Sequence, residues 1–354
     1  MQRILAMIAI LATLTMIGCG GGTGDGGANG AVTWKFAIEE IEGSVQHRYA
    51  TRFKELIEER SGGRITVEVY PYGALGTSSQ ITELTQLGSV QLAMASPGHL
   101  GSVIPEVQIF SLHFVFSDDG TVNHEVLTGS KRLYETLEEA YREASLHLLG
   151  IFQEGWMAWT ANRKLEEPAD FQGLKIRTMN SPLLIRAYEL YEANPTTMAY
   201  SEVYSGLQLN MIDAQVNPVF AIEEMSFYEV QSHMTLARHL PFIATLTTSP
   251  AWFDGLSDED RQMLLDVKRE LDGFIFDFQR ELNERRLDVI TSQGDIEVTE
   301  LTEEQRAAFR EASMPIRDQY RELAGERGAK LLAILLEELE RAENTAAESA
   351  AASN

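Results

Sequence analysis

From Val32 onward, stretches with the hydrophobic pattern of strands alternate with stretches that have the pattern of helices. Apolar and polar residues alternate in Val32–Glu39 and Ile65–Val69, and Tyr49–Ile57 between them has apolar residues at helical spacing. A helical pattern at Ser79–Leu87 and an apolar strand pattern at Val90–Ala95 continue the alternation. Strands that alternate with helices favour an α/β fold with a parallel sheet.

The alternation starts again near Gly155. A strand pattern at Leu174–Thr178 is followed by helical patterns at Leu183–Glu192 and Glu202–Leu209, and then by a strand pattern at Ile212–Val216. A chain of 354 residues is longer than a single hydrophobic core usually organises. We therefore expect a second α/β domain.

A long helix is predicted in the last third of the chain. Ser257 precedes three acidic residues and caps a helical pattern that runs to about Thr291. Such a helix is about 50 Å long, which exceeds one domain of this size, so we expect it to cross both domains. A capping box at Thr302 starts a further helix, and an amphipathic helix is predicted at Ala329–Arg341. The Ala/Ser-rich residues 344–354 are expected to be a frayed tail.

The N-terminal residues have the features of an export signal. Arg3 precedes an apolar run from Ile4 to Leu14, which is too short to span a membrane as a mature helix. The run leads to Met-Ile-Gly-Cys19, which resembles a bacterial lipobox with methionine in place of the commoner leucine. Residues 1–19 are therefore interpreted as a lipoprotein signal peptide with lipidation at Cys19, the only cysteine; the alternative is an ordinary cysteine in a signal peptide cut nearby. Residues 20–31 are rich in glycine and are expected to be a flexible tether to a membrane from the periplasmic side.

The charge and the motifs exclude several classes of function. The chain has 53 acidic and 29 basic residues, a net charge of −24, which disfavours nucleic acid as a partner. It also disfavours attachment to anionic lipid other than through the covalent anchor. No HExxH, GxSxG or P-loop motif is present, and the histidines are scattered without metal-ligand spacing. We therefore expect no catalytic residues, metal or cofactor.

Two predicted strands end in side chains suited to a carboxylate ligand. Arg177 lies at the carboxyl end of one strand and Asn217 at the end of another, and ligand crevices in open α/β sheets lie at those ends. A guanidinium matches the planar fork of a carboxylate, and an amide both donates and accepts hydrogen bonds. Each residue also has an ordinary interpretation, a solvated charge for Arg177 and a turn before Pro218 for Asn217.

Three motifs in order resemble the substrate-binding proteins of tripartite ATP-independent periplasmic (TRAP) transporters, the DctP family. They are Tyr70–Gly76, Asp170–Arg177, and Met198–Gln208 running on into Asn217-Pro218. The resemblance implies a two-domain fold of the periplasmic-binding-protein type, with a hinge and a long helix that spans both domains. The domains would close on a small organic acid and deliver it to TRAP membrane permease subunits. The implied boundaries are residues 32–153 plus 243–282 for domain I and residues 154–242 plus 283–343 for domain II.

The resemblance also implies roles for individual residues. Arg177 would grip the ligand carboxylate, Asn217 would assist, and Tyr200 takes the position of an aromatic residue that lies against the ligand. Met157 stands where many family members have a second arginine, which points to a less charged and more apolar ligand environment. Trp159 would share the face of Met157, although a lone aromatic residue is more often part of a core.

Further candidates lie at strand ends of the first domain. Glu39 and Glu40 end the first predicted strand and would bind a ligand amine, although exposed acids are common in so acidic a chain. Ser96 ends the strand at Val90–Ala95. We expect the ligand to be a monocarboxylate with an apolar or aromatic remainder. The alternatives are a C4-dicarboxylate or a sugar acid, a periplasmic enzyme acting on small acids, and a periplasmic ligand-binding sensory module.

Overall fold

The computed structural model describes residues 32–352. The predicted signal peptide, Cys19 and the glycine-rich tether lie outside the described residues. None of the helices in the described range combines the length and hydropathy that a membrane span requires.

The strands and helices follow the expected alternation, with additions. The strands are β1 (Val32–Ala37), β2 (Ile65–Tyr70), β3 (Leu92–Ala95), β4 (His147–Ala161), β5 (Ile176–Thr178), β6 (Thr196–Thr197), β7 (Ala214–Pro218), β8 (His233–Leu236), β9 (Pro241–Thr248) and β10 (Glu297–Glu300). The α-helices are α1 (Val45–Arg60), α2 (Ser78–Gln86), α3 (Pro97–Leu100), α4 (Gly120–Gly129), α5 (Lys131–Glu143), α6 (Pro182–Glu189), α7 (Val203–Gln208), α8 (Val219–Glu224), α9 (Pro250–Asp254), α10 (Asp258–Gln293), α11 (Glu303–Ser313) and α12 (Ile316–Ala352). Short 3₁₀ helices are η1 (Pro105–Ser111), η2 (Pro168–Phe171), η3 (Tyr200–Glu202) and η4 (Phe227–Glu229).

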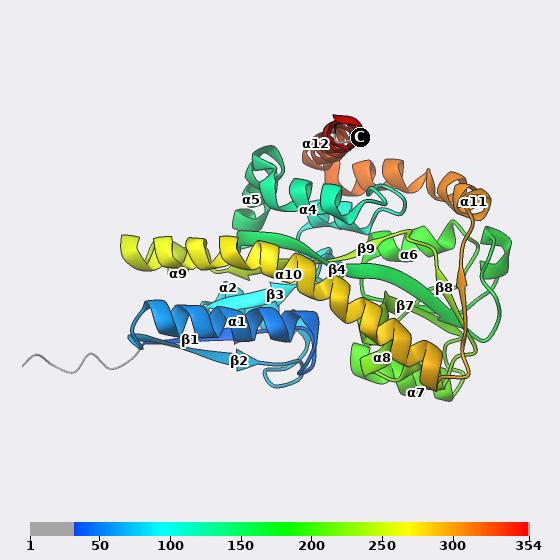
Figure 1. The fold of residues 1–354 in the computed structure, drawn as a ribbon, viewed down its shortest axis with the longest axis horizontal. Helices are drawn as coiled ribbons and strands as arrows, with labels where there is room; N and C mark the ends of the chain where they lie inside the picture. The colour runs from blue at the N-terminus through cyan, green and yellow to red at the C-terminus, as the bar shows by residue number, and fades with distance from the viewer. Residues whose placement is uncertain (1–31, 353–354) are drawn as a thin grey trace, which may run out of the picture. The chain divides into compact units, whose positions relative to one another are not determined.

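Strand β4 belongs to two sheets. Its first part pairs with β9 in sheet A, whose order is β2-β1-β3-β9-β4, and its second part pairs with β7 and β8 in sheet B, which also holds β5, β6 and β10 (Figure 1). The register with β9 shifts between Gln153 and Gly155, just before the strand passes from sheet A to sheet B between Trp156 and Met157. Strand β1 is parallel to β2 and β3, as expected, whereas β9 is antiparallel to both β3 and β4, so sheet A is mixed. The described part of the chain forms one compact unit, and the domain boundaries stay a prediction.

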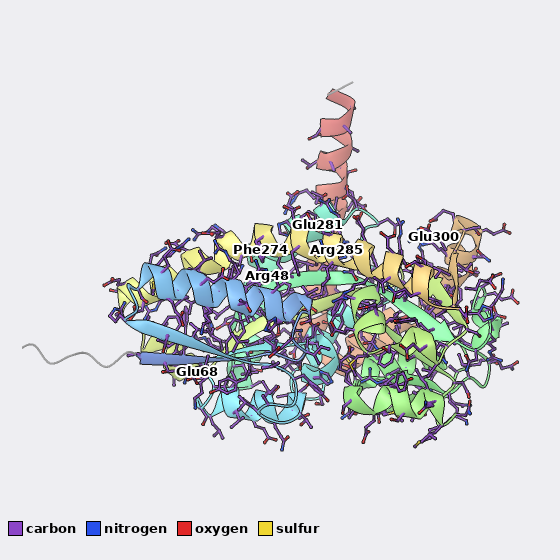
Figure 2. The ribbon with its side chains drawn as sticks, turned by 60° about the horizontal axis from the view of Figure 1, so that its bottom comes forward. Arg48, Glu68, Phe274, Glu281, Arg285 and Glu300 are labelled. Atoms are coloured by element: carbon purple, nitrogen blue, oxygen red, sulfur yellow. The ribbon has the colours of Figure 1, made fainter. Side chains whose placement is uncertain are left out.

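Helix α10 crosses both sheets, as expected. Its 36 residues make it about 54 Å long, and Ser257 caps it by accepting a hydrogen bond from the Asp260 amide. Its first half packs with α1, where the Arg48 guanidinium lies over the Phe274 ring at 5.7 Å (Figure 2). Farther along, Ile290 joins a different core cluster beside sheet B. The helix therefore connects the two halves along their length.

The end of the chain is helical as far as the structure describes it. Residues 344–352 continue helix α12, in keeping with the high helix propensity of alanine, and the fraying of residues 344–354 stays a prediction. Helix α12 begins at Ile316 and contains a kink at Gly325, whose φ of 63° is left-handed. Figure 2 shows its C-terminal part extending away from the two sheets.

Candidate ligand-binding cleft

A cleft of about 440 Å³ lies where the carboxyl ends of strands from both sheets meet. The ends of β1 and β3 bring residues from sheet A, and β5 and β7 bring residues from sheet B. Six of the eight residues expected to bind ligand line the cleft: Glu39, Glu40, Ser96, Arg177, Tyr200 and Asn217. The cleft is also lined by residues that the sequence did not single out, among them Gln46, Tyr72, His99, Met179, Met198 and Phe242.

Arg177 is a buried cation without an acidic partner in the described chain. The residue is 2% exposed, and its Nε and Nη2 atoms donate hydrogen bonds of 3.1 and 2.9 Å to the Met198 carbonyl oxygen. Burial lowers the pKa of Arg177 to about 10, against a smaller opposing effect of two tyrosines. The guanidinium therefore keeps its charge at neutral pH. A buried charge with no counter-charge in the described protein is costly to the fold, and such a group is a natural anchor for an anionic ligand.

Asn217 lies beside Arg177 because of strand register. Strands β5 and β7 are parallel with Arg177 opposite Gln215, so Asn217 is two residues farther along on the face of Gln215. The Asn217 side-chain amide donates a 2.5 Å hydrogen bond to Gln215 Oε1, and Gln215 Nε2 donates a 3.0 Å bond to the Thr160 hydroxyl. This network fixes the Asn217 side chain at the edge of the cleft.

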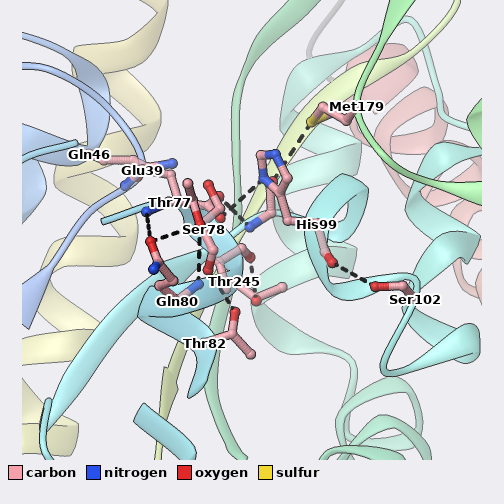
Figure 3. Close-up of polar contacts among 12 residues, drawn as sticks. Glu39, Gln46, Thr77, Ser78, Gln80, Thr82, His99, Ser102, Met179 and Thr245 are labelled. Atoms are coloured by element: carbon pink, nitrogen blue, oxygen red, sulfur yellow. Dashed lines mark hydrogen bonds and ion pairs between the residues drawn. The ribbon is translucent and has the colours of Figure 1, made fainter. Parts of the chain in front are cut away.

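Glu39 is buried among hydrogen-bond donors. Because β1 and β3 are parallel neighbours, their ends lie together, and the Ser96 amide donates a 2.7 Å hydrogen bond to Glu39 Oε2. His99 Nδ1 lies 3.2 Å from Glu39 Oε1 and 2.9 Å from Ser96 Oγ (Figure 3). The ordinary interpretation of Glu39 as an exposed acid therefore does not hold. His99 could have been suggested by its position three residues after Ser96.

Gln46 holds both cleft glutamates in position. Its side-chain oxygen accepts a 2.8 Å hydrogen bond from the backbone N–H of Glu39, and its backbone N–H donates a 3.0 Å bond to Glu40 Oε2. Its Nε2 donates a 3.0 Å bond to Glu154 Oε1 on β4. Burial raises the pKa of Glu40, so this carboxyl is a weaker acid than an exposed glutamate.

Aromatic and sulfur-containing side chains from the two sides meet across the cleft. The ring of Tyr72, which follows β2, contacts the ring of Tyr200 edge-on, with 5.9 Å between centroids. Ser96 Oγ lies 3.9 Å from the sulfur of Met179, which follows β5. These contacts place apolar surface between the acidic side of the cleft and Arg177.

Met157 and Trp159 lie outside the cleft, contrary to the expectation. Both are in the second part of β4 and point into the core beneath sheet B, with exposed fractions of 1% and 0%. Trp159 stacks on His239 at 4.2 Å and donates a 2.9 Å hydrogen bond to the Tyr188 hydroxyl. Met157 borders a separate cavity of about 480 Å³ against α10. The position of a second family arginine therefore does not face the ligand cleft in this chain.

A cleft between two sheets that share a strand, with a buried arginine on one wall, is suited to hold a small anionic solute. Residues 36–323 match the DctP family, described as bacterial extracellular solute-binding protein, family 7. The chain belongs to this family, whose members are TRAP-transporter solute receptors and not enzymes.

Relatives with assigned ligands cover most of the chain. The ectoine-binding periplasmic protein TeaA of Halomonas elongata is 38% identical over 84% of this chain and 87% of its own. The ectoine/5-hydroxyectoine-binding periplasmic protein UehA of Ruegeria pomeroyi is 35% identical over 87% of this chain and 90% of its own. The C4-dicarboxylate-binding periplasmic protein DctP of Rhodobacter capsulatus is 32% identical over 78% of this chain and 82% of its own.

Solved structures share the fold. A TRAP periplasmic solute-binding protein from Marinobacter aquaeolei VT8, in an apo open structure, is 48% identical, with a TM-score of 0.82 over 86% of this chain and 100% of that chain. The ectoine-binding protein of the TeaABC TRAP transporter from Halomonas elongata is 36% identical, with a TM-score of 0.84 over 87% of this chain and 99% of that chain.

Proposed function

We propose that this protein captures a small monocarboxylate that also carries a cationic group, and delivers it to TRAP permease subunits in the membrane. The observation that carries the proposal is the charge arrangement of the cleft. Arg177 lies buried on one side without an acidic partner in the described chain, and Glu39 and Glu40 lie buried on the other. A zwitterion would satisfy both sides at once, with its carboxylate on Arg177 and Asn217.

The same arrangement disfavours a dicarboxylate. Among the described residues that line the cleft, Arg177 is the only lysine or arginine. A second ligand carboxylate would lie near Glu39 and Glu40, and a buried charge without a partner costs several kcal/mol. The expectation of a purely apolar ligand remainder rested on Met157 and Trp159, which lie outside the cleft. We instead propose a cationic remainder beside Tyr72 and Tyr200.

Ectoine is the first ligand to test. It is a small ring that carries one carboxylate and one cyclic amidinium, so its charges match the two walls of the cleft. The ectoine-binding relatives add support from sequence. A flat amidinium can pack on the face of an aromatic ring, and its N–H groups donate hydrogen bonds to a carboxylate, as those of a guanidinium do.

A ligand panel tests the proposal. Thermal unfolding would be followed with ectoine, 5-hydroxyectoine, succinate, malate, galacturonate and an aromatic 2-oxo acid, and any hit would be measured by calorimetry. We expect stabilisation by the two amidinium acids, because a ligand that binds only the folded state raises the free energy of unfolding. Stabilisation by succinate or malate without any by the amidinium acids would refute zwitterion recognition.

We further propose that the protein acts in the periplasm, attached to a membrane through a lipid on Cys19. The support is the charged, apolar and lipobox-like order of residues 1–19, followed by a glycine-rich tether. Such an anchor would keep the receptor near the permease.

A further inference from the structure

Two buried acids face each other behind the cleft. Glu40 is 5% exposed and Glu154 is 0% exposed, and Gln46 donates a hydrogen bond to each of the two carboxyl groups. Glu40 Oε1 and Glu154 Oε2 are buried and have no hydrogen-bond partner among the described groups. Two ionised carboxylates accept hydrogen bonds only, so a hydrogen bond between these two oxygens requires that one of the two acids carries a proton.

The donors around the pair are unequal. Glu40 accepts a hydrogen bond from the backbone amide of Gln46 in the first turn of α1, and the start of a helix favours a negative charge. Glu154 accepts one from Gln46 Nε2 only, and it is repelled by Glu39 as well as by Glu40. Burial and this repulsion raise the pKa of Glu154 well above its ordinary value. These surroundings favour the proton on Glu154 and the negative charge on Glu40.

The remaining ionisable groups around the pair do not reverse this assignment. Glu224 on α8 has its pKa raised to about 9 by burial and by Glu40, so it is neutral at pH 7. Arg286 on α10 lies 2.8 Å from Glu223, which offsets its charge on that side. Burial and the nearby acids raise the pKa of Tyr200, so its hydroxyl is neutral too.

We propose that Glu154 is a neutral carboxylic acid whose O–H donates to Glu40 Oε1 and holds Glu40 as the ionised acid that faces the ligand cation. Glu154 does not line the cleft, so it is a positioning residue that acts through Glu40. This inference rests on the proposed recognition of a cationic group. It explains how an acidic pocket with several buried carboxyl groups presents a defined negative charge to the ligand.

Two substitutions separate the role of the proton from that of packing. In Glu154→Gln the amide N–H replaces the acid O–H, whereas Glu154→Met fills similar space without a donor. The affinity for the proposed cyclic amidinium acid would be measured by calorimetry across the pH range. We expect the Gln variant to keep the wild-type affinity and pH profile. We expect the Met variant to bind about tenfold more weakly at neutral pH, with the acid limb of its profile about one pH unit higher, because Glu40 loses a stabilising donor.

A measurement without ligand tests the proton directly. The infrared spectrum of the free protein at neutral pH is expected to contain a protonated-carboxyl component that Glu154→Gln reduces, leaving the contribution of the neutral Glu224. Glu143→Gln on the exposed face of α5 is the matched control and should leave that component unchanged.

The outcomes are distinct. A Met variant with the wild-type pH profile, or a Gln variant impaired as much as the Met variant, would overturn the proposal. If the Met variant does not fold, the infrared comparison decides, and a spectrum unchanged in Glu154→Gln would refute it. Failure of every variant and of the wild type to bind the amidinium acid, with the infrared component reduced in Glu154→Gln, would refute the proposed ligand and leave the proton on Glu154 established.

Discussion

The side-chain amide of Asn283 on α10 donates a 2.8 Å hydrogen bond to the backbone carbonyl of Glu154 on β4. Asn283 Oδ1 also accepts a 3.1 Å bond from the Phe220 amide at the start of α8. The contact lies where β4 passes from sheet A to sheet B, beside Gly155. One side chain therefore joins the long helix, the shared strand and a helix that borders the cleft.

Gly155→Ala is expected to destabilise the protein by about 1–3 kcal/mol. Gly155 has a φ of +138°, and a Cβ atom there would lie 2.5 Å from Asn283 Nδ2. Urea unfolding would measure the loss. Gly273→Ala is the control, because that helical position in α10 has no atom within 4 Å of the added Cβ, and it should gain about 0.5–1 kcal/mol. Equal stabilities of wild type and Gly155→Ala would contradict the strained crossing.

Arg177→Ala and Arg177→Lys are expected to abolish or strongly weaken ligand binding without unfolding the protein. The alanine variant removes a buried charge that costs the free protein energy, and an ammonium does not reproduce the planar fork of the guanidinium. Calorimetry gives the affinity, and thermal unfolding without ligand gives the stability. Undiminished affinity in either variant would remove Arg177 from the binding site.

The buried histidine pair His113 and His239 is expected to make the fold sensitive to acid. Burial lowers the pKa of His113 to about 3 and that of His239 well below its ordinary value, whereas both titrate near 6.5 when unfolded. Below about pH 6.5 the unfolded chain binds protons that the folded chain does not, so the free energy of unfolding falls as the pH falls towards 3. Each histidine contributes up to about 1.4 kcal/mol per pH unit.

His239→Phe isolates one member of this pair. Neither ring nitrogen of His239 has a hydrogen-bond partner in the described chain, so the substitution removes the titration without removing a bond. Stability measured by urea unfolding between pH 7 and 4 should decline less steeply than in the wild type. The same slope in both proteins would show that His239 is not the acid-sensitive group.

Cys19→Ala is expected to release a soluble protein or to leave unprocessed precursor. A thioether-linked lipid requires the Cys19 sulfur, and the acidic body offers no electrostatic attraction to anionic lipid. Fractionation of cells and mass spectrometry of the N-terminus would measure the change. Correctly cleaved protein that stays on the membrane would exclude lipidation as the attachment.

The residues that line the cleft could be predicted from the sequence, whereas the hydrogen bonds that hold them from behind could not. Arg177, Asn217 and Glu39 could be placed because each stands at the end of a strand pattern, and parallel strands end at one edge. The contact between Gln46 and Glu154 joins residues 108 positions apart, and no periodic pattern marks such a pair.

The direction of side chains on β4 could not be read from the sequence. Nearly all of its residues are buried, so hydrophobic alternation does not distinguish the two faces. Met157 and Trp159 were placed at the ligand by their sequence position, whereas packing against α11 and α6 holds them in the core. Strand β9 was also missed as a partner of β4, because antiparallel pairing across the chain depends on tertiary contacts.

Because β4 is shared by both sheets, a fragment of the chain is not expected to fold by itself. The chain builds part of sheet A, forms most of sheet B, and then returns through β9 to a place between β3 and β4. A chain that stops after β4 would leave the edges of both sheets without their hydrogen-bonding partners. Neither half is therefore expected to be obtained as a folded fragment, and truncation for crystallisation or engineering is best confined to the exposed end of α12.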